Sequence, residues 1–321
     1  MTESLAATIR SGDRRALSQA ITLVESTRPD HRVEARALID ELLPATGGSM
    51  RVGVSGAPGT GKSTLIEALG LQAVREHHQV AVLAVDPSSA RSGGSILGDK
   101  TRMAELGRTS QAYIRPSPTG GTLGGVARHT REAVLLCEAA GFDVVMVETV
   151  GVGQSEVAVA DLVDLFVLVA SPAGGDDLQG IKRGIMELAD LIVVNKADGD
   201  LADAAQRACG DLRNAVHLLR PKRPGWEVDV RTCSALTGFG VNDLWEAITA
   251  AHQRLRDSQA LTALRAQQGV AAMWSEVTEG VLDRLRDDPI AHGRLRDLER
   301  AVADGQMSPT AAAQDVLGQI G

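Results

Sequence analysis

Residues 56–63 read GAPGTGKS, and this glycine-rich segment restricts the possible fold more than any other part of the sequence. It matches the pattern GxxxxGK(S/T) in full, and it lies between an apolar strand candidate at 50–55 and a helical stretch at 63–77. Glycines allow the backbone to turn so that successive N–H groups face one anion, and the following helix adds its positive dipole end. A strand, such a loop and a helix in this order predict a phosphate-binding P-loop.

Apolar runs alternate with helical patterns along the rest of the chain. Strand candidates lie at 80–85, 144–147, 165–169, 191–194 and 228–232, and helical stretches separate them. Strands that alternate with helices predict a mostly parallel sheet with helices on both faces. We therefore expect an α/β fold of the P-loop NTPase type at 47–250, with an N-terminal helical segment at 1–46 and a C-terminal helical segment at 251–321.

Composition and charge argue against several other classes of protein. Only 2% of the 321 residues are aromatic and the formal net charge is -8, so we expect no nucleic-acid partner and no attraction to anionic membranes. Cys137, Cys209 and Cys233 are far apart, which fits reduced thiols better than a disulfide or a zinc site. Because the sequence shows neither an apolar leader nor a stretch of about 18 uncharged apolar residues, we expect a cytoplasmic protein without a membrane span.

The phosphate-binding loop defines the first candidate site residues. We expect Lys62 to place its ammonium on the β- and γ-phosphates of a nucleoside triphosphate. Ser63 would offer its hydroxyl to Mg²⁺, which prefers hard oxygen ligands. The simpler alternative is a glycine-rich turn with an incidental lysine. The nucleotide-binding residues expected in this loop are Gly56, Ala57, Pro58, Gly59, Thr60, Gly61, Lys62, Ser63 and Thr64.

A second motif indicates which base the nucleotide carries. The segment LIVVNKAD at 191–198 places Asn195, Lys196 and Asp198 directly after a strand. An ionised aspartate only accepts hydrogen bonds, and guanine offers it two adjacent donors, whereas adenine offers one donor and one acceptor. Lys196 can cover the base with its aliphatic stem, and Asn195 can join this loop to the phosphate-binding loop. The alternative is a polar loop after a strand, but a second expected base-contacting loop follows the last strand at Ser234, Ala235 and Leu236.

Carboxylates at other strand ends indicate a metal and hydrolysis centre. The segment VVMVETVG at 144–151 brings Glu148 to the carboxyl end of a strand, where it could hold a Mg²⁺-bound water or orient the attacking one. Gly151 could donate its N–H to the γ-phosphate, although the usual GTPase pattern here begins with aspartate rather than Glu148. Asp86 and Asp99 are further metal candidates, and each could instead cap a turn or a helix.

The transferring phosphoryl group also needs positive charge beside it. Lys182 and Arg183 could supply a cation, or they could lie on a solvated helix face. The expected metal ligands are Ser63, Asp86, Asp99 and Glu148, and the expected catalytic residues are Lys62, Asp99, Glu148, Gly151 and Lys182.

The longer segments around these motifs are similar to those of the methylmalonyl-CoA mutase-associated GTPases, the MeaB/ArgK-type chaperones of the SIMIBI class. The resemblance extends over about residues 5–285. The segments that carry it are GAPGTGKSTLIEAL, LAVDPSSARSGGSILGDKTRM, RPSPTGGTLGGVAR, ETVGVGQSEVAVADLVD, SPAGGDDLQGIKRGIMELAD and NKADGD.

This resemblance implies a chaperone that binds GTP and Mg²⁺, hydrolyses GTP slowly and binds the cobalamin-dependent methylmalonyl-CoA mutase. Such a protein gates adenosylcobalamin loading and protects the mutase from inactivation. The resemblance further implies that segment 172–185 is a mobile switch that senses the mutase, and that helices after residue 250 form a homodimer. The positions that match the family's GTP, magnesium and hydrolysis residues are 56–64, Asp198, 234–236, Asp86, Asp99 and Glu148.

Two other functions stay open from the sequence alone. A kinase linked to arginine or ornithine transport would use ATP, and Asn195, Lys196 and Asp198 argue against this choice of nucleotide. A metal-insertion GTPase would favour a tract rich in histidine or cysteine, whereas the seven histidines and three cysteines of this chain are scattered.

Overall fold

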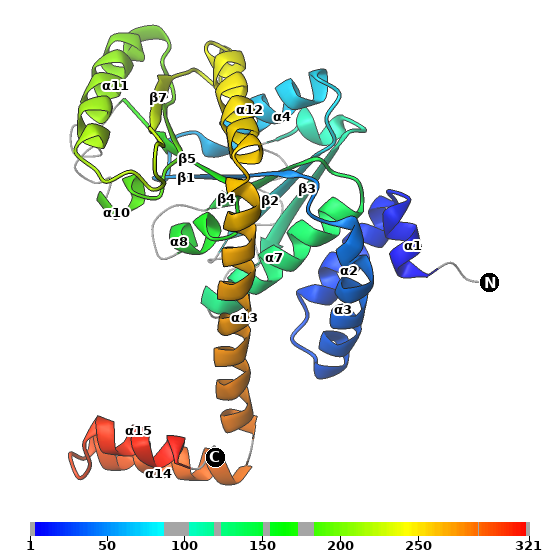
Figure 1. Ribbon diagram of the computed structural model, residues 1–321, viewed down its shortest axis with the longest axis vertical. Helices are drawn as coiled ribbons and strands as arrows, with labels where there is room; N and C mark the ends of the chain where they lie inside the picture. The colour runs from blue at the N-terminus through cyan, green and yellow to red at the C-terminus, as the bar shows by residue number, and fades with distance from the viewer. Residues whose placement is uncertain are drawn as a thin grey trace. The chain divides into compact units, whose positions relative to one another are not determined.

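The structure, a computed structural model, describes residues 4–86, 103–118, 123–149, 155–172, 183–287 and 289–318. The chain divides into two compact units, Met1–Gln268 and Gly269–Gly321. The first unit holds an α/β domain preceded by three helices, and the described part of the second is helical (Figure 1). The three-segment division expected from the sequence stays a prediction.

Seven strands form one sheet in the order β3-β2-β4-β1-β5-β6-β7, and every neighbouring pair is parallel. This confirms the expected α/β architecture with a parallel sheet. Alternate residues of the central strands enter two different cores, as Val144 and Met146 do on one face and Val145 and Val147 on the other. Burial on both faces explains why these strands have unbroken apolar sequences. The strands are β1 (Met50–Gly56), β2 (Val80–Asp86), β3 (Ala112–Pro118), β4 (Val144–Thr149), β5 (Leu165–Ala170), β6 (Leu191–Val194) and β7 (Asp229–Thr232).

Strand β3 was not expected from the sequence, because its segment AYIRPSP contains two prolines. Proline has no N–H to donate and is normally confined to edge strands or bulges. β3 lies at one edge of the sheet and pairs only with β2 among the described strands. Pro116 and Pro118 stand at positions whose main-chain nitrogen points away from β2, so no hydrogen bond of the sheet is lost there.

Helices cover both faces of the sheet. α4 (Lys62–Arg75) and α12 (Val241–Asp257) contribute to the core on one face. α7 (Leu123–Ala139) and α8 (Ser155–Ala160) lie on the other, where α1 (Leu5–Arg10), α2 (Arg14–Val24) and α3 (Pro29–Leu42) add a further layer. The remaining α-helices are α10 (Arg183–Met186), α11 (Ala202–His217), α13 (Ala260–Asp287), α14 (Pro289–Ala303) and α15 (Pro309–Leu317).

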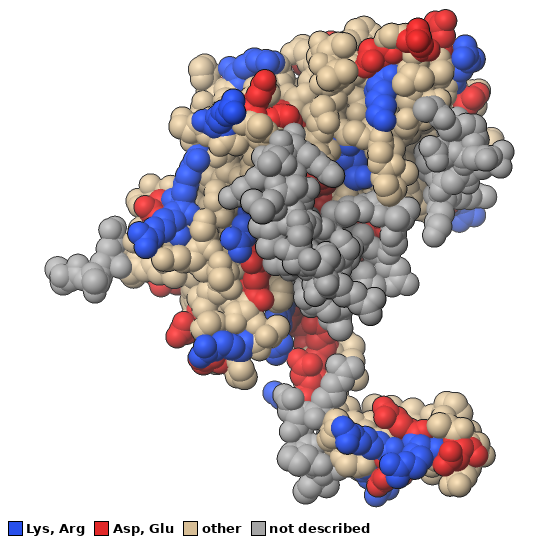
Figure 2. All heavy atoms as spheres, turned by 180° about the vertical axis from the view of Figure 1, so that it is seen from behind, with Lys and Arg blue, Asp and Glu red and all other residues tan. Residues whose placement is uncertain are grey.

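Charged side chains are distributed over the described surface rather than separated by sign. Figure 2 shows basic and acidic side chains mixed on one face of the molecule. Of the helices in the described ranges, none is both long enough and apolar enough to cross a membrane.

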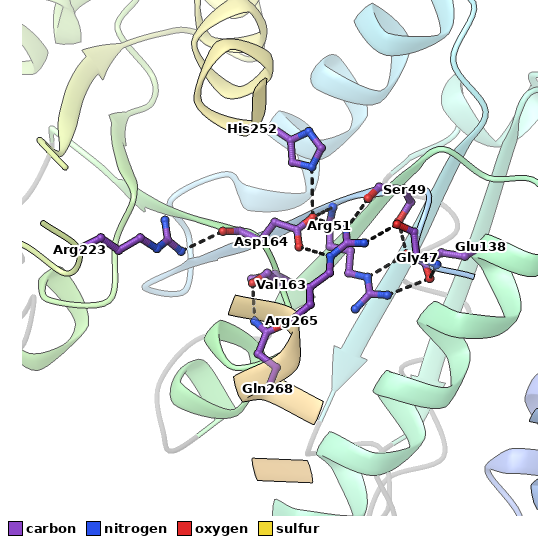
Figure 3. Close-up of polar contacts among 10 residues, drawn as sticks. All are labelled: Gly47, Ser49, Arg51, Glu138, Val163, Asp164, Arg223, His252, Arg265 and Gln268. Carbon is purple, nitrogen blue, oxygen red and sulfur yellow. Dashed lines mark hydrogen bonds and ion pairs between the residues drawn. The ribbon is translucent and has the colours of Figure 1, made fainter. Parts of the chain in front are cut away.

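A group of ionisable residues, here called the amino-edge cluster, lies where β1 and β5 begin (Figure 3). Its members are Arg51, Glu138, Asp164, His252 and Arg265. The fully buried Asp164 carboxylate accepts the main-chain N–H of Arg51 at 2.8 Å and the Arg265 guanidinium at 2.9 and 2.8 Å. Nε2 of His252 lies 3.5 Å from Oδ2 of Asp164. The Arg51 guanidinium donates to the Glu138 carboxylate at 2.9 and 2.8 Å. The cluster thus holds the start of α13 against the start of two central strands.

We expect this cluster to make the stability of the protein depend on pH below about 4. Burial tends to raise the pKa of Asp164, but hydrogen bonds from His252 and Arg265 outweigh it and lower the pKa to about 2, against 3.8 for an unperturbed aspartate. A depressed pKa stabilises the fold above the unfolded-state value, and that contribution is lost as the pH falls toward the folded-state value. The loss amounts to about 2 kcal/mol in the free energy of unfolding.

Urea unfolding at pH values between 2 and 7 measures this contribution. Asp164→Asn should be less stable than the wild type at pH 7, and the difference should shrink as the pH falls from 4 to 2. Asp161→Asn, at an exposed position, is the control because other carboxylates also titrate in this range. A difference between Asp164→Asn and wild type that stays constant with pH would show that Asp164 is not held ionised by its neighbours.

Candidate functional site

The phosphate-binding loop connects β1 to α4 at the carboxyl edge of the sheet, where ligands bind in folds of this type. α4 begins at Lys62, and its N-cap residue, Gly61, provides no side-chain hydrogen bond to the first turn. The first N–H groups of this 14-residue helix therefore stay available for an anion. This is the arrangement that the GAPGTGKS motif predicts.

Two glycines of the loop occupy positions that no other residue fits. Gly56 has φ +153, and a Cβ there would lie 2.2 Å from the carbonyl oxygen of Val169. Gly61 has φ +86, and a Cβ there would lie 2.6 Å from the side-chain nitrogen of Asn195. Both values are far below an ordinary van der Waals contact, so the path of the loop depends on these two glycines.

The ammonium of Lys62 lies inside the loop. Its Nζ donates to the carbonyl oxygens of Gly56 at 2.8 Å and Ala57 at 3.1 Å, and the residue is largely buried. Thr60 closes the same turn, since its hydroxyl also donates to Ala57, at 2.9 Å. A positive charge thus stands next to the helix N-terminus, in the position expected for the lysine that contacts a polyphosphate.

Asn195, which follows β6, joins three loops through one buried side chain. Its Nδ2 donates to the carbonyl oxygen of Thr60 at 2.9 Å, and its Oδ1 accepts the N–H of Ala235 at 3.0 Å. The predicted hydrogen bond to the phosphate-binding loop is therefore present. The link to Ala235 was not predicted, and it attaches the loop after β7 to the same amide.

Replacing Asn195 with alanine should lower the free energy of unfolding by about 2 kcal/mol, because the substitution leaves buried backbone groups at Thr60 and Ala235 without their partner. GTP should also bind more weakly, since the phosphate-binding loop loses its connection to the loop after β6. Urea unfolding and GTP titration measure the two effects. Asn214→Ala, on the exposed side of α11, is the matched control, and equal stability of the two variants would contradict the role of Asn195.

The two expected base-contacting loops also meet each other. Asp198 accepts a hydrogen bond from the hydroxyl of the buried Ser234, and the same hydroxyl accepts the N–H of Thr237 at 3.1 Å. Lys196 has φ +64, and its Nζ donates to the carbonyl oxygen of Gly59 at 2.6 Å, so its aliphatic stem lies along the phosphate-binding loop. Leu236 extends outward and is 82% exposed. Sequence segments about 40 residues apart thus form one continuous edge around the phosphate-binding loop.

Two of the four expected metal ligands lie together. The Ser63 hydroxyl at the start of α4 donates to Oε1 of Glu148 at 2.7 Å, and Glu148 is buried at the end of β4. A hydroxyl and a carboxylate are hard oxygen donors of the kind that Mg²⁺ prefers, so these two residues fit a magnesium site. Within the described part of the chain, no group of three or more His, Cys, Asp or Glu side chains is arranged to hold a metal.

The other expected residues of the metal and hydrolysis centre are described only in part. β2 ends at Asp86, two residues beyond the point where Ala84 lies opposite Glu148, so the main chain of Asp86 reaches the same edge. The side chain of Asp86 and all of Asp99, Gly151 and Lys182 lie outside the described residues.

A buried hydrogen bond next to this centre was missed at the sequence level. The Thr149 hydroxyl donates to the Ser55 hydroxyl at 2.8 Å and links the ends of β4 and β1 beneath the phosphate-binding loop. The available signal was that Ser55 and Thr149 are polar residues at the ends of apolar strands.

A phosphate-binding loop after β1 and an Asn-Lys-x-Asp loop after β6, on a parallel sheet of this order, define a P-loop GTPase. Comparison with known proteins identifies the family within this class. The family model described as methylmalonyl Co-A mutase-associated GTPase MeaB matches residues 17–289. The chain belongs to this family.

Individual relatives agree with this assignment. The chain is 48% identical over 301 residues to the GTPase ArgK of Escherichia coli K12, which covers 94% of this chain and 91% of that protein. It is 47% identical over 319 residues to the mitochondrial methylmalonic aciduria type A homolog of the mouse, with 95% of this chain and 76% of that protein covered. The crystal structure of an LAO/AO transport system kinase superposes with a TM-score of 0.79 at 40% identity, covering 98% of this chain and 96% of that one.

Proposed function

We propose that this GTPase is a chaperone of a cobalamin-dependent methylmalonyl-CoA mutase, which uses GTP to gate adenosylcobalamin loading and to protect the mutase from inactivation. The observation that supports this best is the match to the mutase-associated GTPase family over residues 17–289. The joined phosphate-binding and base-contacting loops support the choice of GTP as the nucleotide.

The proposed roles within the site follow from where each group lies. The N–H groups of residues 56–64 and the ammonium of Lys62 bind the phosphates, and Asp198 accepts hydrogen bonds from the guanine edge. Ser63 and Glu148 would hold Mg²⁺, which would supply positive charge to neutralise the phosphates. Glu148 is also the described carboxylate best placed to orient a water molecule at this edge.

The remaining residues are proposed from their position in the chain. Asp86 is the last residue of β2, Asp99 follows that strand along the chain, Gly151 follows β4, and Lys182 follows β5. All three strands end at the edge that carries the phosphate-binding loop, because the sheet is parallel. We propose Asp86 and Asp99 for the metal, Asp99 also for hydrolysis, Gly151 for the γ-phosphate, and Lys182 as a cation at the transferring phosphoryl group.

A kinase linked to amino-acid transport is the second candidate, because the similar crystal structure carries that name. Such a kinase would need ATP, whereas the carboxylate of Asp198 would face the acceptor nitrogen of adenine. The contact between Asp198 and Ser234 holds this carboxylate at the base-contacting edge, and this favours the GTPase function.

We also propose that the protein is a homodimer that uses the second compact unit. In α13, Val270, Met273, Trp274 and Val277 are 56, 52, 61 and 46% exposed. Their spacing places them on one face of the helix, and a contiguous apolar face of this kind typically binds another protein surface. A second copy of the chain offers a self-complementary partner for such a stripe.

Replacing Trp274 with glutamate should convert the dimer into a monomer, because a charge at the centre of an apolar interface loses its hydration without a partner. Light scattering coupled to size-exclusion chromatography measures the mass. Ser275→Glu is the matched control, since Ser275 lies on the opposite side of the same helix. A wild-type protein that is already a monomer, or a Trp274→Glu variant that stays dimeric, would contradict the proposed interface.

The chaperone function is tested by measuring Mg²⁺-dependent GTP turnover, with ATP as the control nucleotide, in the presence and absence of purified methylmalonyl-CoA mutase. We expect slow GTP turnover that rises when the mutase is added, and no comparable ATP turnover. If the mutase leaves GTP turnover unchanged, the proposed partner is wrong. If ATP is the better substrate, the kinase alternative replaces the proposal.

A further inference from the structure

An open cavity of about 540 Å³ lies at the amino end of the edge strand β3. α2, the start of β3 and the short 3-10 helix η2 (Leu106–Arg108) supply its walls. The nucleotide loops follow the carboxyl ends of strands, and β6 and β7 lie on the far side of the sheet from β3. The cavity is therefore separate from the GTP site.

The charges that line this cavity are positive. Arg14 of α2 and Arg108 of η2 both contribute, and no aspartate or glutamate is part of the lining. Arg14 is held by a hydrogen bond from Nη2 to the carbonyl oxygen of Ser110. Within the described ranges, the guanidinium of Arg108 makes no hydrogen bond or ion pair, although the chain as a whole carries a net charge of -8. Two guanidinium groups beside one cavity favour an anionic ligand.

The main chain of β3 adds one donor to this cavity. The N–H of Val80 donates to the carbonyl oxygen of Gln111 at 2.8 Å, so in the parallel register the odd-numbered residues of β3 bond to β2. The main-chain N–H and C=O groups of the even-numbered residues point away from β2. The N–H of Ala112 donates to the carbonyl oxygen of Thr109, and Pro116 and Pro118 have no N–H. Among the outward main-chain groups of β3, the N–H of Ile114 is therefore the donor available to a ligand.

This pattern favours a short ligand over an added strand. An added strand needs donors along the whole edge, and the prolines remove them. A phosphate is usually held by several N–H groups at a helix start or in a glycine-rich loop, whereas this cavity has one. A carboxylate needs fewer donors and matches the planar fork of arginine. The other lining residues that carry side chains are Tyr113, Ala104, Ala112 and Ile114.

The wall that carries Arg108 is preformed. The main-chain N–H of Glu105 donates to Oε1 of Glu67 on α4 at 2.8 Å. The buried side chain of Leu106 packs closely on Gly70 of α4. A Cβ added at Gly70 would lie 2.5 Å from Cδ2 of Leu106. On the opposite wall, the Tyr113 hydroxyl lies 3.1 Å from that of Ser18 on α2. Because these contacts exist before any ligand binds, little ordering is required for binding.

From these observations we propose that the cavity binds a small organic acid. Its carboxylate accepts hydrogen bonds from Arg108, Arg14 and the N–H of Ile114, and its short apolar body lies against the ring of Tyr113. This proposal does not rest on the proposed chaperone function, because the cavity lies apart from the nucleotide loops.

Tyr113 is the one tyrosine of the chain, so any tyrosine signal comes from this lining residue. Full-length protein carrying ring-¹³C tyrosine gives one set of tyrosine NMR signals. Titration at constant ionic strength would use three probes: butyrate, n-butylamine with the same number of carbon atoms and the opposite charge, and inorganic phosphate. We expect butyrate to shift the Tyr113 signal saturably, and the other two to leave it unchanged.

Variants test the role of the guanidinium. Arg108→Gln should weaken butyrate binding roughly tenfold or more, since a charged hydrogen bond is lost. Arg15→Gln, at the exposed position next to Arg14, should bind butyrate as the wild type does. Absence of a saturable butyrate shift, an equal shift in Arg108→Gln, or saturation by n-butylamine would overturn the proposal. Saturation by phosphate alone would show that the cavity selects a different anion and would overturn the carboxylate assignment. GTP turnover plays no part in this test, so its result stands apart from that of the proposed function.

Discussion

Lys62→Ala is expected to lower GTP turnover by at least about 100-fold. The ammonium lies within the phosphate-binding loop, 2.8 Å from the carbonyl oxygen of Gly56 and next to the N-terminus of α4. Phosphoryl transfer depends mainly on positioning and charge neutralisation, so the loss of this cation removes stabilisation that the loop N–H groups cannot replace.

Single-turnover GTP hydrolysis, together with thermal unfolding, measures this effect. Arg75→Ala, in the last turn of the same helix, is the matched control and should retain wild-type turnover. The Lys62→Ala variant should still fold, because alanine is well tolerated at the start of a helix. A variant that folds and hydrolyses GTP at the wild-type rate would remove the phosphate-binding loop from the mechanism.

Asp198→Asn is expected to weaken GTP binding roughly 100-fold and to move the preference toward xanthosine triphosphate. Asparagine presents one acceptor and one donor where the carboxylate presents two acceptors. Guanine then faces a donor with its own amino group, whereas xanthine has a carbonyl oxygen at that position. The hydrogen bond from Ser234 to residue 198 can persist in the variant, so the loop itself should not be displaced.

Competition titrations with GTP, xanthosine triphosphate and ATP measure this change of preference. Asp200→Asn, two residues further along in an exposed position, is the control and should keep the preference for GTP. A variant at position 198 that still strongly prefers GTP would show that another group selects the base.

The parallel sheet and the position of the nucleotide site were predictable because each depends on local sequence. The loop at 56–63 carries its own backbone requirements, and strands buried on both faces have apolar runs that need no long-range information. β3 escaped prediction because Pro116 and Pro118 are unfavourable in most strands and are tolerated here only at the edge. Whether a strand lies at an edge is a property of the whole sheet.

The contacts among the candidate site residues were less predictable than their places at the strand ends. Ser63 and Glu148 were both expected near the metal, but their direct contact joins positions 85 residues apart. The ion pair between Asp164 and Arg265 joins positions 101 residues apart and was not expected at all. Charged residues carry no periodic pattern that indicates burial, so only the packed fold shows which of them become partners.

The amino-edge cluster and the nucleotide loops lie at opposite ends of the same two strands. β1 runs from Arg51 in the cluster to Gly56 in the phosphate-binding loop, and β5 runs from beside Asp164 to Ala170, whose carbonyl oxygen accepts the N–H of Asn195 at 2.9 Å. Local opening of either strand would break contacts at both ends together. The two ends therefore belong to one cooperative unit for hydrogen exchange, and a nucleotide that slows opening of the loops also protects the amides beside the cluster.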